Sequence, residues 1–173
     1  LEQGYGSRIV VPGAGFLLNN EMGDFNGKPG LTTDRGLIGT EPNLARPEQR
    51  MLSSMTPSIL AKDGELVAVV GTPGGRTIIN TVLQVLLNVM EFDMDIQRAV
   101  DARRFHHQWL PDRIYLEEGG FTPEAVARLE AMGHAVQKRS SQGRATSIMI
   151  DSATGERLAA PDGRAADSGA AGH

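Results

Sequence analysis

The sequence predicts an α+β fold, because strand and helix patterns come in separate blocks along the chain. Short β-type runs come first, two helical patterns follow, and a strand, a helix and further strands close the chain. This order favours layers of antiparallel sheet and helix over regular strand–helix–strand alternation. The length of 173 residues suits one domain, and 40% hydrophobic residues suffice for a core.

Composition argues against several functional classes. A net charge of −4 without a basic patch argues against a nucleic-acid partner. The sequence has no apolar run of about eighteen residues, which a membrane-spanning helix would need. It has no cysteine, which excludes disulfides, thiolate metal ligands and a cysteine nucleophile. No motif calls for a cofactor. Leu1 starts the chain without a signal-peptide pattern, so we expect a segment cut from a longer protein.

The first fifty residues predict a hairpin followed by a long loop. Residues 7 to 11 and 15 to 18 are short β-type runs separated by Pro12-Gly13, which predicts paired strands. Residues 26 to 50 are rich in Gly, Pro, Asn and Thr and have little periodicity. A loop of this length is usually a lid, a binding loop or a disordered segment, and we interpret it as a lid.

The valine-rich run of residues 66 to 70 predicts a buried strand. The turn signal Asp63-Gly64 before it predicts an antiparallel partner strand that ends at Ala61. Residues 77 to 90 are apolar on nearly every face, which predicts a helix from about Arg76 that is buried between layers.

The second half of the chain predicts two shorter helices and the closing strands. Asp95 is expected to cap a helix through Ala102, and Thr122-Pro123 to start a helix that ends at Gly133. Strands are expected at residues 113–117, 135–138, 146–150 and 157–159. We place the domain at residues 1–160 and expect poor order in residues 161–173, which are rich in Ala, Gly and Asp.

The run Gly71-Thr72-Pro73-Gly74-Gly75 lies where a strand ends and a helix begins. Unpaired N–H groups and the helix dipole favour negative charge there, and the glycines let a ligand approach the backbone. Gly74 and Gly75 therefore suit a bound anion or the oxyanion of an acyl-transfer transition state. The alternative is a tight connection only, and the spacing of phosphate-binding loops is absent.

Two pairs of polar residues suggest a site for an amino-acid zwitterion. Glu21 and Asp24 follow a strand and precede the long loop, so they suit an ammonium group. Ser53 and Ser54 lie at the same end of the predicted hairpin as the glycine turn and suit a carboxylate. The simpler alternatives are a solvated acidic turn and a pair of serines that end a strand.

Other catalytic signals are weak. His106-His107 has no Cys or acid cluster at ligand spacing, so we predict no metal site and expect packing beside Phe105 and Trp109. The Gly-x-Ser-x-Gly pattern of many serine hydrolases does not occur.

Several blocks together resemble the small subunit of γ-glutamyltransferase (γ-glutamyltranspeptidase) in order and spacing, over about residues 1 to 160. The blocks are Asn19-Asn20-Glu21-Met22-Gly23-Asp24-Phe25, Ser53-Ser54-Met55-Thr56-Pro57-Ser58, Gly71-Thr72-Pro73-Gly74-Gly75-Arg76 and Arg104-Phe105-His106-His107-Gln108-Trp109-Leu110-Pro111.

The resemblance implies an N-terminal nucleophile hydrolase with an αββα sandwich, made as a precursor that cuts itself into a large and a small subunit. The small subunit of the family begins with a threonine, whose hydroxyl is the nucleophile and whose α-amine is the base. It passes a γ-glutamyl group, usually from glutathione, to water, an amino acid or a peptide. The resemblance also implies a large-subunit partner and a periplasmic, secreted or outer-surface location.

Carried over by position, Glu21 and Asp24 would bind the donor's α-ammonium and Ser53-Ser54 its α-carboxylate. The N–H groups of Gly74-Gly75 would form the oxyanion hole. The resemblance thus agrees with the zwitterion site proposed from chemistry.

The sequence departs from the family pattern at its start, where the threonine-led segment is absent, so we expect no activity from this polypeptide alone. Glu2 stands where many members have asparagine, Arg35 where some have tyrosine, and Arg103 where proline is frequent. Two alternatives are a cephalosporin-acylase-like amidohydrolase and a non-catalytic amino-acid-binding module.

Overall fold

The computed structural model describes residues 5–171, so the predictions on Leu1 and Glu2 fall outside the described residues. The chain divides into two compact units. The first contains the residues up to Ser53 together with Trp109–Pro111, and the second contains Ser54–Gln108 and the residues from Asp112 onward. The domain limit at residue 160 stays a prediction.

An antiparallel sheet of four strands, in the order β1-β2-β6-β7, forms the centre of the second unit. Its strands are β1 (Ser58–Lys62), β2 (Glu65–Gly71), β6 (Thr146–Ile150) and β7 (Arg157–Ala160). Ser58 pairs with Val70, and Gly71 pairs with Thr146. The predicted hairpin is confirmed, and its register places the approach from Ser54 and the exit toward Gly74 at the same end.

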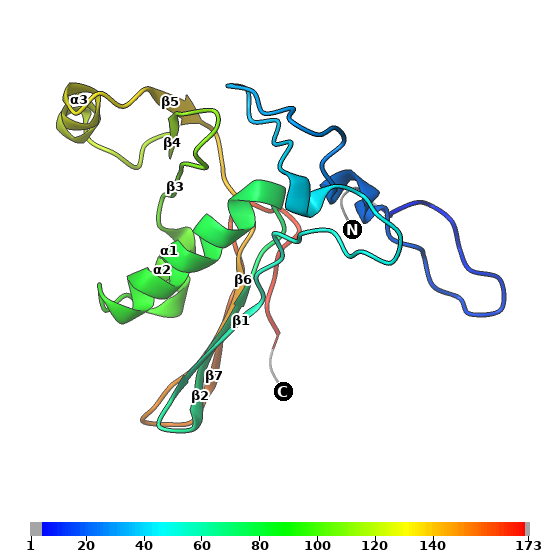
Figure 1. Ribbon diagram of the computed structural model, residues 1–173. Helices are drawn as coiled ribbons and strands as arrows, with labels where there is room; N and C mark the ends of the chain where they lie inside the picture. Colours follow the sequence, from blue (N-terminus) through cyan, green and yellow to red (C-terminus); the bar gives the residue numbers. More distant parts are fainter. Residues whose placement is uncertain (1–4, 172–173) are drawn as a thin grey trace. The chain divides into compact units, whose positions relative to one another are not determined.

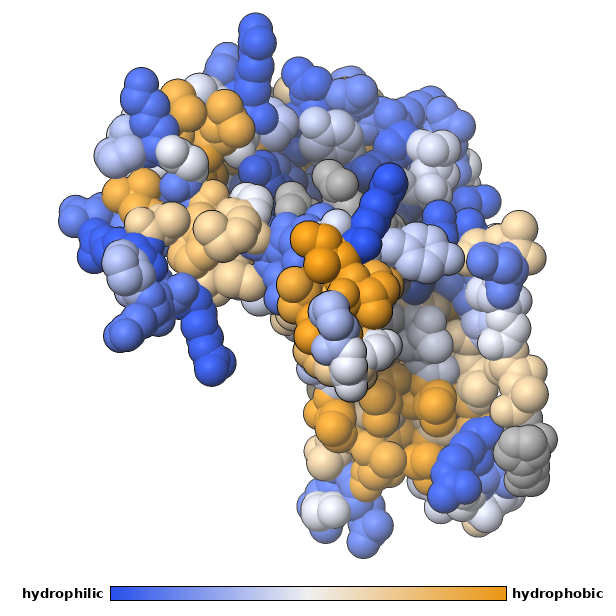
Figure 2. All heavy atoms as spheres, turned by 90° about the vertical axis from the view of Figure 1, so that its right-hand side faces the viewer, coloured by the Kyte–Doolittle hydropathy of each residue, from blue (hydrophilic) through white to orange (hydrophobic). Residues whose placement is uncertain are grey.

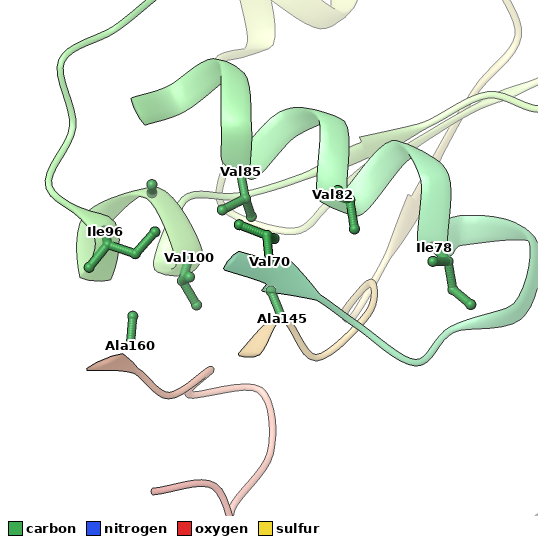
Figure 3. Packing of buried hydrophobic residues seen from close by; sticks show 9 residues of the cluster. Val70, Ile78, Val82, Val85, Ile96, Val100, Ala145 and Ala160 are labelled. Carbon is green, nitrogen blue, oxygen red and sulfur yellow. The ribbon is translucent and has the colours of Figure 1, made fainter. Parts of the chain in front are cut away.

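Two helices, α1 (Ile78–Met90) and α2 (Ile96–Asp101), cover one face of this sheet (Figure 1). Asp95 caps α2 as predicted, since its carboxylate accepts a hydrogen bond of 2.8 Å from the Arg98 N–H. The core lies between these helices and the sheet (Figure 3). Its buried residues are Val70, Ile78, Val82, Val85, Ile96, Ala99, Val100, Ala145 and Ala160.

The prediction that the long apolar helix is buried on all sides is wrong for the described residues. Helix α1 buries Ile78, Val82 and Val85, whereas Leu83 and Met90 on its other side are each 52% exposed. The sheet and α2 cover only one side of α1, so its second apolar stripe has no layer over it among residues 5–171.

A second sheet, of order β3-β4-β5, contains β3 (Phe105–His106), β4 (Ile114–Glu117) and β5 (Val136–Arg139). Strands β4 and β5 are parallel, joined by α3 (Pro123–Ala131), whose cap Thr122 accepts from the Ala125 N–H at 3.2 Å. The order of elements did not predict this local strand–helix–strand unit. Parallel neighbouring strands need a crossover connection of a dozen or more residues, usually a helix, and the segment between β4 and β5 provides one.

The four-stranded sheet is hydrophobic on the face away from the helices as well. Ile59, Val69 and Ile148 lie in register across three strands and are 74%, 37% and 41% exposed. Figure 2 views this side and shows hydrophobic residues, in orange, over the lower, sheet-bearing part of the molecule. A sheet that is apolar on both faces suits the inner position of a layered fold.

In residues 5–53, the first unit shows loops with two short 3₁₀ helices, η1 (Glu21–Asp24) and η2 (Glu41–Asn43). The predicted N-terminal hairpin is reduced to a Val10–Leu17 bridge with flanking backbone hydrogen bonds. The predicted long loop folds back on itself at Asn26, whose side chain donates to the Thr40 carbonyl at 2.6 Å. None of the described helices is long and apolar enough to cross a membrane.

Candidate active site

The glycine turn connects β2 to the helix α1, as the sequence predicted. Gly74 has φ +147° and Gly75 has φ +55°, both in a region that L side chains rarely adopt. The N–H and the hydroxyl of Thr77 both donate to the Gly74 carbonyl, at 3.1 and 2.9 Å. A Cβ on Gly74 would lie 2.7 Å from Thr77 Oγ1, whereas a Cβ on Gly75 would meet open space. The Gly75 side is thus open to a ligand.

A second turn lies beside the glycine turn because β2 and β6 are paired. The pocket between the turns has a volume of about 280 Å³ and is lined by Pro73, Gly74, Gly143 and Arg144. The Thr72 hydroxyl connects them, since it donates to the Pro73 carbonyl at 2.7 Å and accepts from the Arg144 N–H at 2.9 Å. Gly143 and Arg144 were not predicted from the sequence as site residues. The available signal was a glycine between two predicted strands.

A buried group of charges, which we call the ionic cluster, consists of Arg104, Glu117, Asp162 and Arg164. Arg104 pairs with Asp162 at 3.0 Å, while Arg164 pairs with Asp162 at 3.2 Å and also with Glu117. The structure therefore holds Asp162 and Arg164 in place, although poor order was expected from residue 161 onward. None of these four residues was predicted from the sequence to have a role of its own.

The ionic cluster also fixes the turn that carries Arg144. Arg104 Nη1 donates to the Gln142 carbonyl at 2.7 Å, and the Gln142 N–H donates to Glu117. The Ala145 N–H donates to Asp162 Oδ2 at 2.7 Å. The turn is therefore held by charged groups on both sides of Gly143-Arg144.

Both carboxylates of the ionic cluster are stabilised in their charged form. Burial raises the pKa of Glu117, but the hydrogen bonds from Arg164 and from the Arg104 N–H outweigh it and hold the pKa below its usual value. Burial likewise raises the pKa of Asp162, and the Arg164 N–H, the charge of Arg104 and the Ala145 N–H lower it below the usual value. These carboxylates are structural anions.

Glu21 and Asp24 lie at the two ends of η1 in the first unit, and both are half-buried. A 3₁₀ helix has three residues per turn, so residues three apart share one side. The Asp24 carbonyl accepts from the buried Asn43 side chain at 2.6 Å, and the Glu21 N–H donates to the Asn19 side chain at 3.0 Å. The sequence predicted that these carboxylates act together, and the helix gives them a common side.

Ser53 and Ser54 lie in a stretch without helix or strand, and the division of the chain into two units falls between them. Ser53 is exposed and belongs to the first unit, whereas Ser54 is half-buried and belongs to the second. The Ser54 carbonyl accepts from the Thr56 hydroxyl at 2.9 Å. The structure thus groups Glu21 and Asp24 in one unit and Ser54 with Gly74-Gly75 in the other, and the assembled site stays a prediction.

His106 and His107 have different surroundings, and their expected packing beside Phe105 and Trp109 stays a prediction. His106 is buried, stacks on Tyr115 with 6.4 Å between ring centroids, and contacts Gln108 at 2.8 Å. His107 is half exposed and contacts Asp112 at 3.0 Å. Burial lowers the pKa of His106 below its ordinary value. In the part of the chain that the structure describes, no three His, Cys, Asp or Glu residues are grouped as for a metal ion.

Comparison with known proteins gives matches over nearly the whole chain. The family model described as Gamma-glutamyltranspeptidase matches residues 1–172. The glutathione hydrolase proenzyme of Escherichia coli K12 is 43% identical over 169 residues, which is 98% of this chain and 29% of that proenzyme. The chain therefore spans less than a third of the length of this relative.

Solved structures agree with the sequence matches. A crystal structure of a Helicobacter pylori gamma-glutamyltranspeptidase mutant is 41% identical, with a TM-score of 0.83, and the match covers 94% of this chain and 88% of that chain. The cephalosporin acylase of Bacillus halodurans is 25% identical, with a TM-score of 0.77, over 98% of this chain and 30% of that one. The predicted α+β fold and its N-terminal nucleophile hydrolase class are confirmed by these neighbours. The chain belongs to the gamma-glutamyltranspeptidase family.

Proposed function

We propose that the complete protein is a γ-glutamyltransferase that transfers or hydrolyses the γ-glutamyl group of glutathione and related compounds. Residues 5–171 would bind the donor and stabilise the oxyanion, and the nucleophile would be an N-terminal threonine that lies outside residues 1–173. The observation that carries the proposal is the Gly74-Gly75 turn: both glycines have positive φ angles, a Cβ on Gly75 would meet open space, and Gly74 lines a pocket.

In the proposed reaction, the threonine hydroxyl attacks the γ-carbonyl carbon of the donor and gives its proton to the threonine's own α-amine. The carbonyl oxygen becomes an oxyanion that accepts hydrogen bonds from the N–H groups of Gly74-Gly75. The carbon–nitrogen bond then breaks, the leaving amine takes up the proton, and a γ-glutamyl ester remains on the threonine. Water or the amine of an acceptor attacks this ester, and the threonine hydroxyl is restored.

Donor recognition would use the two pairs of polar residues. Glu21 and Asp24 are half-buried on one side of η1, which supports a role in binding the α-ammonium. Ser53-Ser54 would donate hydrogen bonds to the α-carboxylate, and the large subunit of the same precursor would add an arginine.

The large subunit would also cover the open face of the sheet, where Ile59, Val69 and Ile148 are exposed. Burial of such apolar surface contributes about 25 cal/mol per Å² to association. The family resemblance supports a periplasmic, secreted or outer-surface location.

The test uses two anilides that differ only in the α-amino group: γ-glutamyl-p-nitroanilide and glutaryl-p-nitroanilide. The complete protein is expected to turn over the glutamyl compound with kcat/KM at least about tenfold higher, because loss of one hydrogen bond to a charged group costs about 1.5–3 kcal/mol. Preference for the glutaryl compound would favour the acylase alternative, which the Bacillus halodurans neighbour supports. Binding of glutamate without turnover of either anilide would favour the binding module.

A further inference from the structure

The pocket beside the glycine turn has a cationic wall that donor recognition does not use. Its four lining residues come from two turns, and Arg144 is the charged one among them. Arg144 is exposed, and no side chain in residues 5–171 forms an ion pair or hydrogen bond with its guanidinium. Arg104 and Arg164, in contrast, are buried and paired with carboxylates.

The backbone that carries Arg144 is nevertheless rigidly held. Its N–H donates to Thr72 Oγ1, and the ionic cluster fixes the residues on both sides, Gln142 and Ala145. Gly143, at φ +65°, packs so closely that a Cβ would lie 2.9 Å from Thr81 Oγ1 and 3.0 Å from Thr72 Oγ1. A fixed backbone with a free guanidinium beside a pocket is suited to hold an anion, and a planar guanidinium matches a carboxylate in two hydrogen bonds.

We propose that Arg144 binds the free carboxylate of the acyl acceptor, an amino acid or short peptide, and thereby positions its amine for transfer. This inference rests on the proposed function, in which Gly74 supplies an oxyanion donor at the wall of the same pocket. In the proposed function, the donor's own α-ammonium and α-carboxylate are assigned to other residues, Glu21-Asp24 and Ser53-Ser54. The other carboxylate in the reaction belongs to the acceptor amino acid or peptide, which occupies the same side of the scissile bond as the leaving group.

In the transfer step, the acceptor amine attacks the carbonyl carbon of the γ-glutamyl ester. A carbon–nitrogen bond forms, the ester carbon–oxygen bond breaks, and the proton of the amine goes to the threonine oxygen. Arg144 takes no part in this bond exchange. It holds the acceptor's carboxylate, which lowers the entropy cost of bringing the amine to the ester.

The experiment measures the complete enzyme with γ-glutamyl-p-nitroanilide, whose leaving group carries no carboxylate. Glycylglycine and glycylglycinamide serve as acceptors that differ in one charge. Arg144→Gln is compared with Arg157→Gln, an exposed arginine on β7 that does not line the pocket. We expect Arg144→Gln to raise KM for glycylglycine about tenfold, the low end for a hydrogen bond between charged groups, and to leave KM for the amide within about twofold.

A second measurement uses ionic strength, since the attraction of an exposed guanidinium is screened by salt. KM for glycylglycine should rise with salt in the unsubstituted enzyme and in Arg157→Gln, but not in Arg144→Gln. Equal changes of KM for both acceptors, or no preference of the unsubstituted enzyme for the acid over the amide, would overturn the assignment of Arg144. Turnover of the anilide with water tests the proposed function separately, and its absence in the unsubstituted enzyme would remove both proposals.

Discussion

The η1 region and the glycine turn are both candidate recognition elements, but they are supported in different ways. Helix η1 buries none of its residues, and its Asp24 carbonyl accepts a hydrogen bond from the Asn43 side chain. The glycine turn joins a core strand to a core helix and contacts a second turn that the ionic cluster holds. In the first region the charge of a side chain would provide the function, whereas in the second the backbone would. Substitutions should therefore separate binding effects from effects on rate and stability.

The largest expected effect is a loss of stability when the ionic cluster, which holds the turn next to the glycine turn, loses a charge. Asp162→Asn removes the charge that faces Arg104, and loss of one partner of a buried ion pair typically costs about 3–5 kcal/mol of stability. The midpoint of thermal unfolding of the complete protein should fall accordingly. The control Glu41→Gln breaks an exposed pair with Arg46 in the first unit and should cost at most about 1 kcal/mol. Equal losses in the two variants would contradict the structural role of the ionic cluster.

The next largest effect concerns the glycine turn itself. Gly75→Val places a branched side chain at φ +55° on the open side of the turn, where the substrate carbonyl would approach. We expect kcat and kcat/KM to fall together by about 10²–10³, the usual loss for one oxyanion donor, with little change in donor Kd.

The matched control for the glycine turn is Gly64→Val. Gly64 has φ +85° and open space around it, but it lies in the turn at the opposite end of the β1–β2 hairpin. This control carries similar backbone strain without contact to the site, and thermal unfolding of both variants shows whether they fold equally well. A folded Gly75→Val enzyme with the kcat of Gly64→Val would leave these glycines as a structural turn.

A smaller effect is expected at η1. Asp24→Asn should weaken donor binding by roughly 1.5–3 kcal/mol, because one hydrogen bond between charged groups is lost. Donor Kd and KM would rise, while the midpoint of thermal unfolding would stay within about 1 °C, since η1 contributes no buried residue. Asp34→Asn, an exposed residue of the same unit, is the control. A donor KM equal to that of Asp34→Asn would count against the ammonium site.

The smallest effect near neutral pH is the acid sensitivity of the second unit. Because the pKa values of Glu117 and Asp162 are lowered by folding, the unfolded chain takes up protons first as the pH falls below the ordinary values of 4.5 and 3.8. The stability from these groups is therefore complete above about pH 4.5 and is lost as the pH falls toward the lowered values. Unfolding midpoints between about pH 3 and pH 7 should show a weaker acid dependence in Asp162→Asn than in Glu41→Gln.

Much of the second unit could be predicted because its signals are local. The valine run that became β2, the Asp63-Gly64 turn and the caps Asp95 and Thr122 each depend on a few neighbouring residues. The start of the long helix was predicted at about Arg76, and α1 begins at Ile78, after the short 3₁₀ turn Gly75–Thr77. Such patterns are set by periodicity and by side-chain-to-backbone hydrogen bonds, which sequence shows directly.

The missed features depend on contacts between distant residues. Arg104, Glu117 and Asp162 are ordinary charged residues in sequence, and only their meeting in space buries them. Arg144 lies beside the glycine turn because β2 pairs with β6, which brings the turn of Gly143-Arg144 next to that of Gly74. The prediction that α1 is buried on all sides failed for its second apolar stripe. An apolar pattern indicates that a surface will be covered, but it does not show which segment covers it. The assembly of Glu21, Asp24, Ser53 and Ser54 with the glycine turn stays a prediction.

The ionic cluster has a consequence for the order of assembly during synthesis. Asp162 lies 58 residues after Arg104, and Arg164 lies 47 residues after Glu117. A ribosome delivers the strand and helix around the glycine turn well before it delivers these partners, and contacts of such long sequence separation form late. Until then the turn of Gly143-Arg144 lacks the Asp162 carboxylate that its neighbour Ala145 needs. The wall of the pocket would therefore be completed only after nearly all of these residues have left the ribosome, so a half-made chain would not present a finished pocket.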